Sequence, residues 1–476
     1  MKKILLRALA FLLIIAFASC GKGFLEVQPK GKVIAGSYRD YDLLLNNFDL
    51  LNTGADAQLM MGDEAAVTAP YYSSLTLREQ RLFMWNDKIY EPDENSEETN
   101  GPLMAIYTYN KIINEVMSSE GGTEAQRQSV LAEARAGRAW TYFLLINYYG
   151  RPYNEATAGT DPGFPLITSA DVTANSFHRA TVQEVYSFII EDLQQAIPAL
   201  PTAITHRLRM SKSAAEALLG KVYVFMHRYQ EALPLLQSSL QGLASAQIPV
   251  KLYDYNKAFA PGGVFMPVTI FGPNYPLTND NEEVMYLRQH SNFHVMFNTL
   301  VATAATMALY APDDLRLLLY SATPFPDGAP FPAGMQRRMA PSIVPFGVGL
   351  PEIYLLLAEC KARNSDSQGA KEMLEILRSN RMPASAAAVP QSVLADKKRL
   401  LQFIIEERLR EFALLGYRWF DMRRLAADPL IGNTTFSHTL YNANGSTTVF
   451  TFRPERFALK IPPRILNTNP GMEDNP

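Results

Sequence analysis

Residues 404–425 read IIEERLREFALLGYRWFDMRRL, and this stretch decides the fold. Glu406 and Arg410 stand four residues apart with the acid first, the order that favours an ion pair along a helix. Gly416 suits the position just after a helix end, because glycine readily adopts the left-handed conformation found there. A helix over 393–415 is therefore predicted. Its apolar face has the helical spacing of Leu401, Ile404, Ile405, Leu409, Phe412 and Leu415.

A second, shorter helix is predicted after Gly416, with arginines near its C-terminal end, where the helix dipole favours positive charge. Its core residues are Trp419, Phe420 and Met422. Charges that alternate along two packed helices form either a structural lattice or part of an active site, and the lattice is the commoner case. We therefore expect Trp419 in the core and a set of paired, structural, partly buried charges: Glu406, Glu407, Arg410 and Arg418.

The totals describe an ordinary globular protein with a large core. The 476 residues carry a net charge of −3, with 47% hydrophobic and 19% charged residues. This balance leaves no basic stripe for nucleic acid, so nucleic acid is not an expected partner. Of the two cysteines, Cys20 stands at the end of an N-terminal leader formed by residues 1–19, so no disulfide framework is expected. Cys360 falls in an apolar helical pattern and is predicted to be a buried thiol.

The N-terminus has the pattern of an export signal. Residues 1–19 contain Lys2, Lys3 and Arg7, then an apolar run too short to span a membrane, then two small residues. Cys20 follows at once, as in bacterial lipoproteins, where the cysteine thiol carries a lipid that anchors the chain without spanning the bilayer. The alternative is a plain signal peptide followed by a chance cysteine. We predict a lipid-modified Cys20 and a tether over 20–37.

The rest of the chain is predicted to be one mostly α-helical domain over 38–476. Helix pairs are expected around 123–241 and 351–425, enough to stack as a tetratricopeptide-like solenoid. Within the hairpins at 211–241 and 351–380, Gly220 is expected to face Ala232 across a close contact, and Ala358 to face the helix of Ala370. Thr181 and Glu184 predict a capping box. Long loop-rich insertions are expected at 52–100, 151–180, 242–350 and 426–476, and insertions of this length are usually functional.

The residue pattern of 404–425 resembles the signature of the SusD/RagB family. The resemblance extends along the chain from Cys20 to the Pro462-Pro463 and Asn-Pro steps at the end. It implies a lipid-anchored outer-membrane protein that faces the cell surface. It also implies capture of an oligosaccharide, or a peptide, and delivery to a SusC-like TonB-dependent transporter.

Catalytic signals are scarce in the sequence. A phosphate-binding glycine loop and a nucleophile elbow do not occur. His290 and His294 lack the glutamate of a metalloprotease helix and are expected to be exposed rather than a metal pair. The run from Asn279 to Glu283 lacks the spacing of a calcium loop and is interpreted as a solvated turn. We expect no catalytic residues, no cofactor and no metal, and therefore not an enzyme.

Aromatic side chains on the insertions are the remaining candidates for ligand binding, because their rings cover the apolar faces of sugars and peptides at low entropic cost. Trp85 is the one tryptophan outside a predicted helix, so it is the leading candidate; the alternative is that it plugs the insertion onto the helices. The candidate ligand residues are Trp85, Asn86, Tyr71, Tyr72, Tyr275 and Tyr286, with Phe293 and Tyr320 as further members of the 242–350 insertion.

Three functions remain open on the sequence alone. A binding lipoprotein agrees with the cysteine, the helix pairs and the aromatic insertions. A secreted glycan-degrading enzyme on a helical scaffold is the first alternative, and turnover of a polysaccharide would distinguish it. A periplasmic repeat scaffold is the second, but it has no need of long aromatic insertions.

Overall fold

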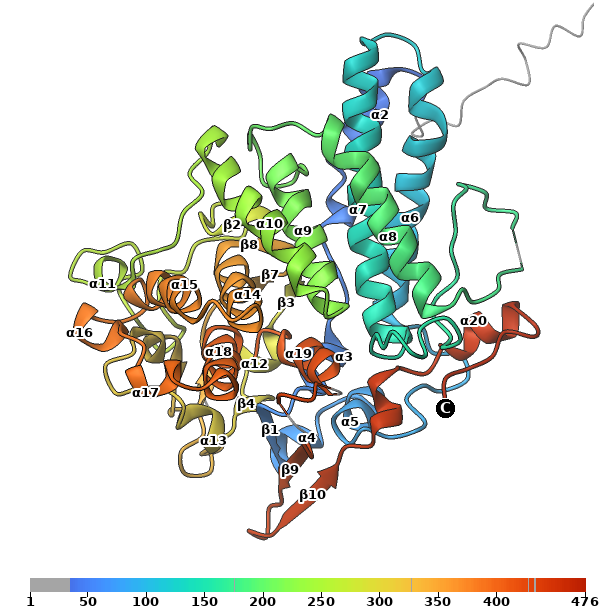
Figure 1. The fold of residues 1–476 in the computed structure, drawn as a ribbon. Coiled ribbons are helices and arrows are strands. Elements are labelled where there is room, and N and C mark those ends of the chain that lie inside the picture. Colours follow the sequence, from blue (N-terminus) through green and yellow to red (C-terminus); the bar gives the residue numbers. More distant parts are fainter. Residues whose placement is uncertain (1–34, 175, 327, 427, 432–433) are drawn as a thin grey trace, which may run out of the picture.

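The computed structural model describes residues 35–174, 176–326, 328–426, 428–431 and 434–476, and it is mostly helical (Figure 1). Cys20 and the leader lie outside these residues. None of the described helices is long and apolar enough to cross a membrane. The long helices are α6 (Glu97–Glu115), α7 (Glu124–Tyr149), α8 (Val182–Ala196), α9 (Lys212–Phe225), α10 (Tyr229–Gln241), α14 (Leu350–Arg363), α15 (Ser367–Ser379) and α18 (Lys397–Phe412). The helices after Thr123 lie within the predicted helix pairs, whereas α6 begins inside the 52–100 segment that was expected to be loop-rich.

The helices stack side by side as the repeat spacing predicts. The pairs α6–α7, α9–α10 and α14–α15 pack along their lengths, α8 packs on α7, and α10 packs on α14. In Figure 1 the stack runs from cyan α6 and α7 through green α9 and α10 to orange α14, α15 and α18. The predicted mostly-α arrangement of helix pairs is confirmed.

Local capping signals are also confirmed. The Thr181 hydroxyl accepts a hydrogen bond from the Glu184 amide at 3.2 Å, and the Glu184 carboxylate accepts one from the Thr181 amide at 2.7 Å. Gly416 has φ +78° and follows the turn that ends α18. Cys360 is a buried free thiol.

The close contact predicted at Gly220 is present between α9 and α10. A Cβ atom added at Gly220 would lie 2.7 Å from Cγ of Leu236 and 3.3 Å from the carbonyl oxygen of Ala232. Both distances are shorter than ordinary carbon contacts, so the absence of a side chain at Gly220 sets how closely the two helices approach.

Replacing Gly220 by leucine is therefore expected to overpack this interface and lower the free energy of unfolding by about 1–3 kcal/mol. Gly159→Leu is a matched control, because a Cβ at exposed Gly159 meets nothing within 4 Å. Urea unfolding of both variants tests the contact. Equal unfolding midpoints for Gly220→Leu and wild type would show that the two helices separate without loss.

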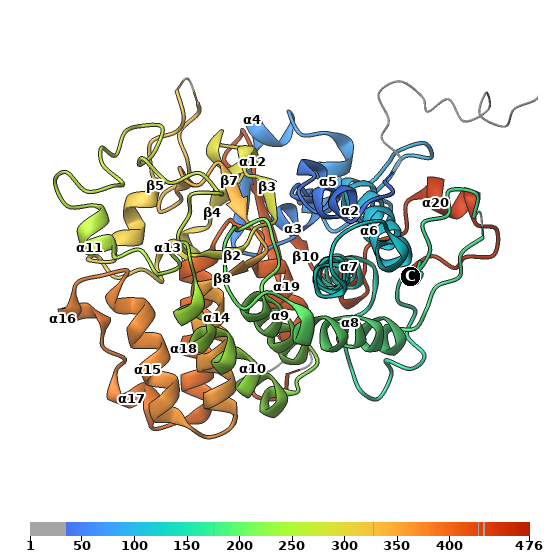
Figure 2. The same cartoon turned by 90° about the horizontal axis from the view of Figure 1, so that it is seen from above.

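Part of the chain outside the long helices folds into short elements on one side of the stack. Figure 2 shows α4 and α12 on the side opposite α8, α10 and α15. The short helices are α2 (Tyr38–Leu44), α3 (Asp56–Met60), α4 (Ala69–Tyr72), α5 (Leu77–Phe83), α11 (Tyr255–Ala258), α12 (Phe293–Met296), α13 (Ala304–Met307), α16 (Ala384–Ala387), α17 (Gln391–Leu394), α19 (Arg418–Leu425) and α20 (Pro463–Thr468).

A four-stranded sheet joins three of the segments that the sequence marks as insertions. Its strands are β1 (Ala65–Thr68), β4 (Val301–Ala302), β9 (Ser437–Tyr441) and β10 (Thr447–Thr451), in the order β10-β9-β1-β4. Val67 pairs with Leu440 in parallel register, and Ala65 pairs with Ala302 in antiparallel register. Three two-stranded ladders fall in the 242–350 segment, and they pair β2 (Val284–Tyr286) with β8 (Val348–Gly349), β3 (Gln289–Ser291) with β7 (Ile343–Pro345), and β5 (Tyr320–Ser321) with β6 (Arg337–Arg338).

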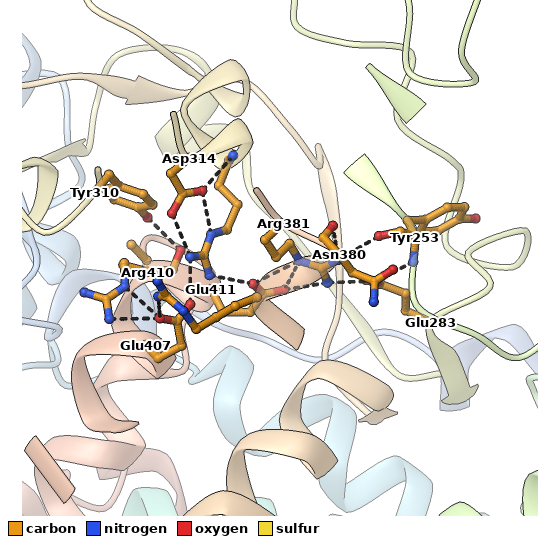
Figure 3. A network of polar contacts seen from close by, with 12 residues as sticks. Tyr253, Glu283, Tyr310, Asp314, Asn380, Arg381, Glu407, Arg410 and Glu411 are labelled. Carbon is orange, nitrogen blue, oxygen red and sulfur yellow. Dashed lines mark hydrogen bonds and ion pairs between the residues drawn. The ribbon is translucent and has the colours of Figure 1, made fainter. Parts of the chain in front are cut away.

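The signature helix α18 carries a buried charge network (Figure 3). Glu407 accepts hydrogen bonds from Arg316 at 2.7 Å, from Arg378 at 2.6 Å and from Arg410 at 2.9 Å. Burial raises the pKa of Glu407, but the charges of these arginines outweigh it and hold the pKa well below its ordinary value. Arg316 belongs to the 242–350 segment and Arg378 to α15, so the network fastens this segment to the helix stack.

A second carboxylate extends the network along the same helix. Glu411 accepts hydrogen bonds from Arg316 at 2.9 Å and from Arg381 at 2.8 Å, and Arg381 also donates to Glu283 at 2.7 Å. Arg418 pairs with Asp63 at 2.5 Å, and Trp419 is fully buried. The expected pairing of buried charges is confirmed for Glu407, Arg410 and Arg418.

The predicted Glu406–Arg410 ion pair is wrong. Arg410 instead bonds Glu407, three residues before it, while Glu406 accepts a hydrogen bond from Gln402 at 3.0 Å. The reason is burial: Glu407 faces the interior, where it needs counter-charges, and Glu406 is half-buried at the helix edge.

Candidate functional site

Trp85, the leading ligand candidate of the sequence, lies in the core. Its side chain is 3% exposed, and its indole N–H donates to the carbonyl oxygen of Met61 at 3.2 Å. The ring stacks on His438 with centroids 3.9 Å apart and meets Phe452 edge-on at 5.1 Å. The expectation that Trp85 lies on the surface is therefore wrong. Strand β9 and the segment after β10 cover the ring, so Trp85 packs the insertion against the rest of the fold, as the alternative interpretation predicts.

The other predicted ligand residues are scattered. Asn86 is exposed beside the buried Trp85, and Tyr286 is buried beneath the guanidinium of Arg288. Tyr72 is half-buried and meets Phe83 edge-on. Tyr275 lines a narrow pocket of about 60 Å³, and Tyr320 is buried against Tyr310. The structure does not bring these candidates together on one surface.

A row of phenylalanine rings is exposed on the insertion side instead. Phe293 and Phe297 lie at α12 with centroids 5.7 Å apart, Phe297 meets Phe325 at 4.9 Å, and Phe325 meets Phe271 at 5.6 Å. Phe271, Phe293 and Phe297 are 61%, 51% and 43% exposed. We call these four residues the phenylalanine row. Exposed apolar groups gathered in this way usually mark an interaction surface.

The side chain of Arg337 connects the backbone segments that carry the row. Its buried guanidinium donates to the carbonyl oxygens of Thr323 at 3.0 Å, of Met296 at 3.3 Å and of Ile270. These carbonyls belong to the three backbone segments that carry Phe325, Phe297 and Phe271. A single buried cation therefore sets the relative positions of three rings.

Two polar side chains position the Phe325 segment further. The Asn298 side chain accepts a hydrogen bond from the Phe325 amide at 2.6 Å, and the Tyr71 hydroxyl accepts one from the Ala329 amide at 2.9 Å. Asn298 has φ +70°, a left-handed conformation that asparagine tolerates better than most residues. Tyr71, a predicted ligand residue, thus reaches the row from α4 as a support.

A tight turn presents Phe271 at one end of the row. Thr269 and Gly272 pair through two backbone hydrogen bonds of 3.0 and 2.9 Å, and Gly272 has φ +108°. Phe293 was among the residues that the sequence suggested, whereas Phe271, Phe297 and Phe325 were missed. Phe293 and Phe297 are spaced by one helical turn, so this local spacing is the signal that could have added Phe297 to Phe293.

The two histidines near the row behave differently from each other. His290 was expected to be exposed but is buried, with its ring nitrogens facing the carbonyl oxygens of Ser291 and Leu415. Nε2 of His294 faces Glu79 Oε1 at 3.1 Å and Asp56 Oδ1 at 3.8 Å. Burial lowers the pKa of His294, but the hydrogen bonds that the protonated ring donates to the two carboxylates outweigh it and raise the pKa to about 9.

Family models match both ends of the chain. A model described as "Starch-binding associating with outer membrane" matches residues 24–224, and the SusD family model matches residues 350–476. The chain belongs to the SusD/RagB family. The SusD-like protein P2 of Formosa agariphila is 25% identical over 414 residues, which cover 76% of this chain and 77% of that protein. A SusD-like protein of Bacteroides ovatus is 26% identical over 240 residues, covering 44% and 37% of the two chains.

Solved structures of SusD-like proteins share the fold of this family member. A SusD superfamily protein from Bacteroides fragilis has a TM-score of 0.70 at 18% identity, covering 93% of this chain and 100% of that one. A structure titled laminarin-binding SusD-like protein has a TM-score of 0.66 at 19% identity, covering 93% and 100%. At these identities the likeness establishes the fold, and the site must be argued from its own residues.

Proposed function

We propose that this SusD/RagB-family protein is a lipid-anchored binding protein of the outer membrane that captures a carbohydrate on the phenylalanine row. It then delivers the carbohydrate to a SusC-like TonB-dependent transporter. The observation that carries the proposal is the row itself, a set of rings that are both exposed and rigidly supported by Arg337. Rigid rings cover the apolar face of a sugar with little loss of conformational entropy.

The comparisons support the same class of ligand. One family model is described as starch-binding, and one structural relative is titled laminarin-binding. The row also suits the side chains of an extended peptide, so a binding screen should include both oligosaccharides and peptides. The proposed role is capture without turnover. The side chains described beside the rings, Arg337, Asn298 and Tyr71, hydrogen-bond the backbone and hold the row in place.

Replacing Phe297 by alanine should weaken ligand binding at least tenfold, about 1.4 kcal/mol. Phe297 contacts Phe293 and Phe325, so its removal interrupts the row at its centre. The measurement is calorimetric titration of the soluble chain that begins after Cys20, using the ligand found in the screen. Phe48→Ala is the matched control, since Phe48 is 72% exposed and lies outside the row.

Both variants should unfold like wild type, because surface substitutions usually change stability by less than about 0.5 kcal/mol. Wild-type affinity in Phe297→Ala, together with wild-type affinity in Phe293→Ala, would contradict the proposal that this row binds the ligand.

Cys20 should be the lipid-modified first residue of the mature protein. Mass spectrometry of the protein extracted from membranes should find acyl groups on Cys20, and Cys20→Ser should shift the protein from the membrane to the soluble fraction. An unmodified mature chain that begins at another residue would contradict the anchor.

A further inference from the structure

Three side chains that ligate metals in other proteins converge beside the phenylalanine row. Asp56 begins α3, Glu79 lies in α5 and His294 lies in α12. One potential ligand atom from each lies within 4.8 Å of the other two. The residues are far apart in the sequence, so the cluster exists only because the fold brings three short helices together.

The second oxygen of each carboxylate is already held. Asp56 Oδ2 accepts a hydrogen bond from Arg78 at 2.8 Å, and Arg78 also pairs with buried Glu98. Glu79 Oε2 caps α5, where it accepts hydrogen bonds from the Thr76 amide at 2.7 Å and hydroxyl at 2.8 Å. Oδ1 of Asp56 and Oε1 of Glu79 are therefore turned toward Nε2 of His294. Such supporting bonds orient the ligands of protein metal sites.

We propose that Asp56, Glu79 and His294 form a binding site for a divalent transition-metal ion of the zinc type. One imidazole nitrogen and two carboxylate oxygens are a ligand set that suits zinc. Zinc binds such atoms at about 2.0–2.2 Å, which places tetrahedral ligands roughly 3.4 Å apart. The separations of 3.1 and 3.8 Å from Nε2 lie on either side of that value. All three side chains are partly exposed, so an ion can reach the cluster from solvent.

The site also has a consequence for the surface next to it, a step that rests on the proposed function. His294 follows Phe293 in α12, and Phe297 comes directly after the helix, so an ion bound to His294 joins this segment to α3 and α5. The ion is expected to restrict the motion of the two rings, and a ligand that needs both rings in place then binds more tightly.

The test is calorimetric titration of zinc chloride into the full chain, purified in detergent and stripped with a chelator. Wild type should bind one equivalent, and His294→Gln and Glu79→Gln should bind at least tenfold more weakly. His206→Gln is the matched control, because His206 is an exposed histidine outside the cluster. Cobalt chloride provides a second readout: its visible absorption should intensify with wild type and not with His294→Gln. Thermal unfolding without metal shows whether each variant is folded.

Equal zinc binding by wild type and His294→Gln, or no binding by either, would overturn the site and leave an ion pair between a protonated His294 and the two carboxylates. The outcomes also separate the site from the proposed function. If zinc binds but does not change carbohydrate affinity, the coupling to the rings is wrong while the site stands. If Phe297→Ala loses carbohydrate while zinc does not bind, the proposed function stands alone.

Discussion

Glu407→Gln is expected to lower the free energy of unfolding by about 3–5 kcal/mol, the usual effect of removing one partner from a buried charge pair. Glutamine keeps the volume of the side chain but removes the charge that Arg316, Arg378 and Arg410 share. Water does not reach this site, because Glu407 is fully buried. The guanidinium groups therefore keep their desolvation penalty and lose the attraction that offset it.

The matched control is the preceding residue. Glu406→Gln removes the same charge from the half-buried edge of α18, where a glutamine is its hydrogen-bond partner, and should change stability by less than about 0.5 kcal/mol. Urea unfolding of both variants measures the difference. Equal effects at the two positions would mean that the buried network contributes nothing beyond a surface charge.

A double variant makes the test informative even if the single variant is poorly folded. Adding Arg410→Gln to Glu407→Gln removes one of the uncompensated cations, so the double variant should lose less stability than the sum of the two single variants. A strictly additive result would contradict the pairing of Arg410 with Glu407.

The second large effect is expected at Trp85, where Trp85→Ala should lower the free energy of unfolding by about 3–5 kcal/mol, as deletions of buried aromatic rings do. The ring stacks on His438, which stacks in turn on Phe83 with centroids 4.4 Å apart. Its removal opens a cavity between α5 and strand β9 and leaves the carbonyl oxygen of Met61 without its indole donor.

Asn86→Ala, at the exposed neighbouring residue, should unfold like wild type and serves as the control. Thermal unfolding and ligand titration of both variants separate stability from binding. A Trp85→Ala protein that melts like wild type but no longer binds ligand would restore Trp85 as a ligand residue.

The amino-acid sequence by itself determined the helices of this protein and how they pair. Helical periodicity, the capping box at Thr181 and the small residue Gly220 are local signals, and each acts on neighbours within a few turns or across one hairpin. The same holds for the apolar face of the stretch 404–425, which lies on one helix, and for the place of Trp419 in the core.

Only the tertiary structure decided which side chains form surfaces and sites. Trp85 is buried because a strand more than 350 residues later in the chain covers it. Glu407, and not Glu406, binds arginines because α15 and the 242–350 segment both contact the side of α18 that carries Glu407. The phenylalanine row and the Asp56–Glu79–His294 cluster gather residues from separate segments. The exposure of a loop side chain depends on contacts with residues distant in the sequence. A helical period or a capping motif is local and does not predict such contacts.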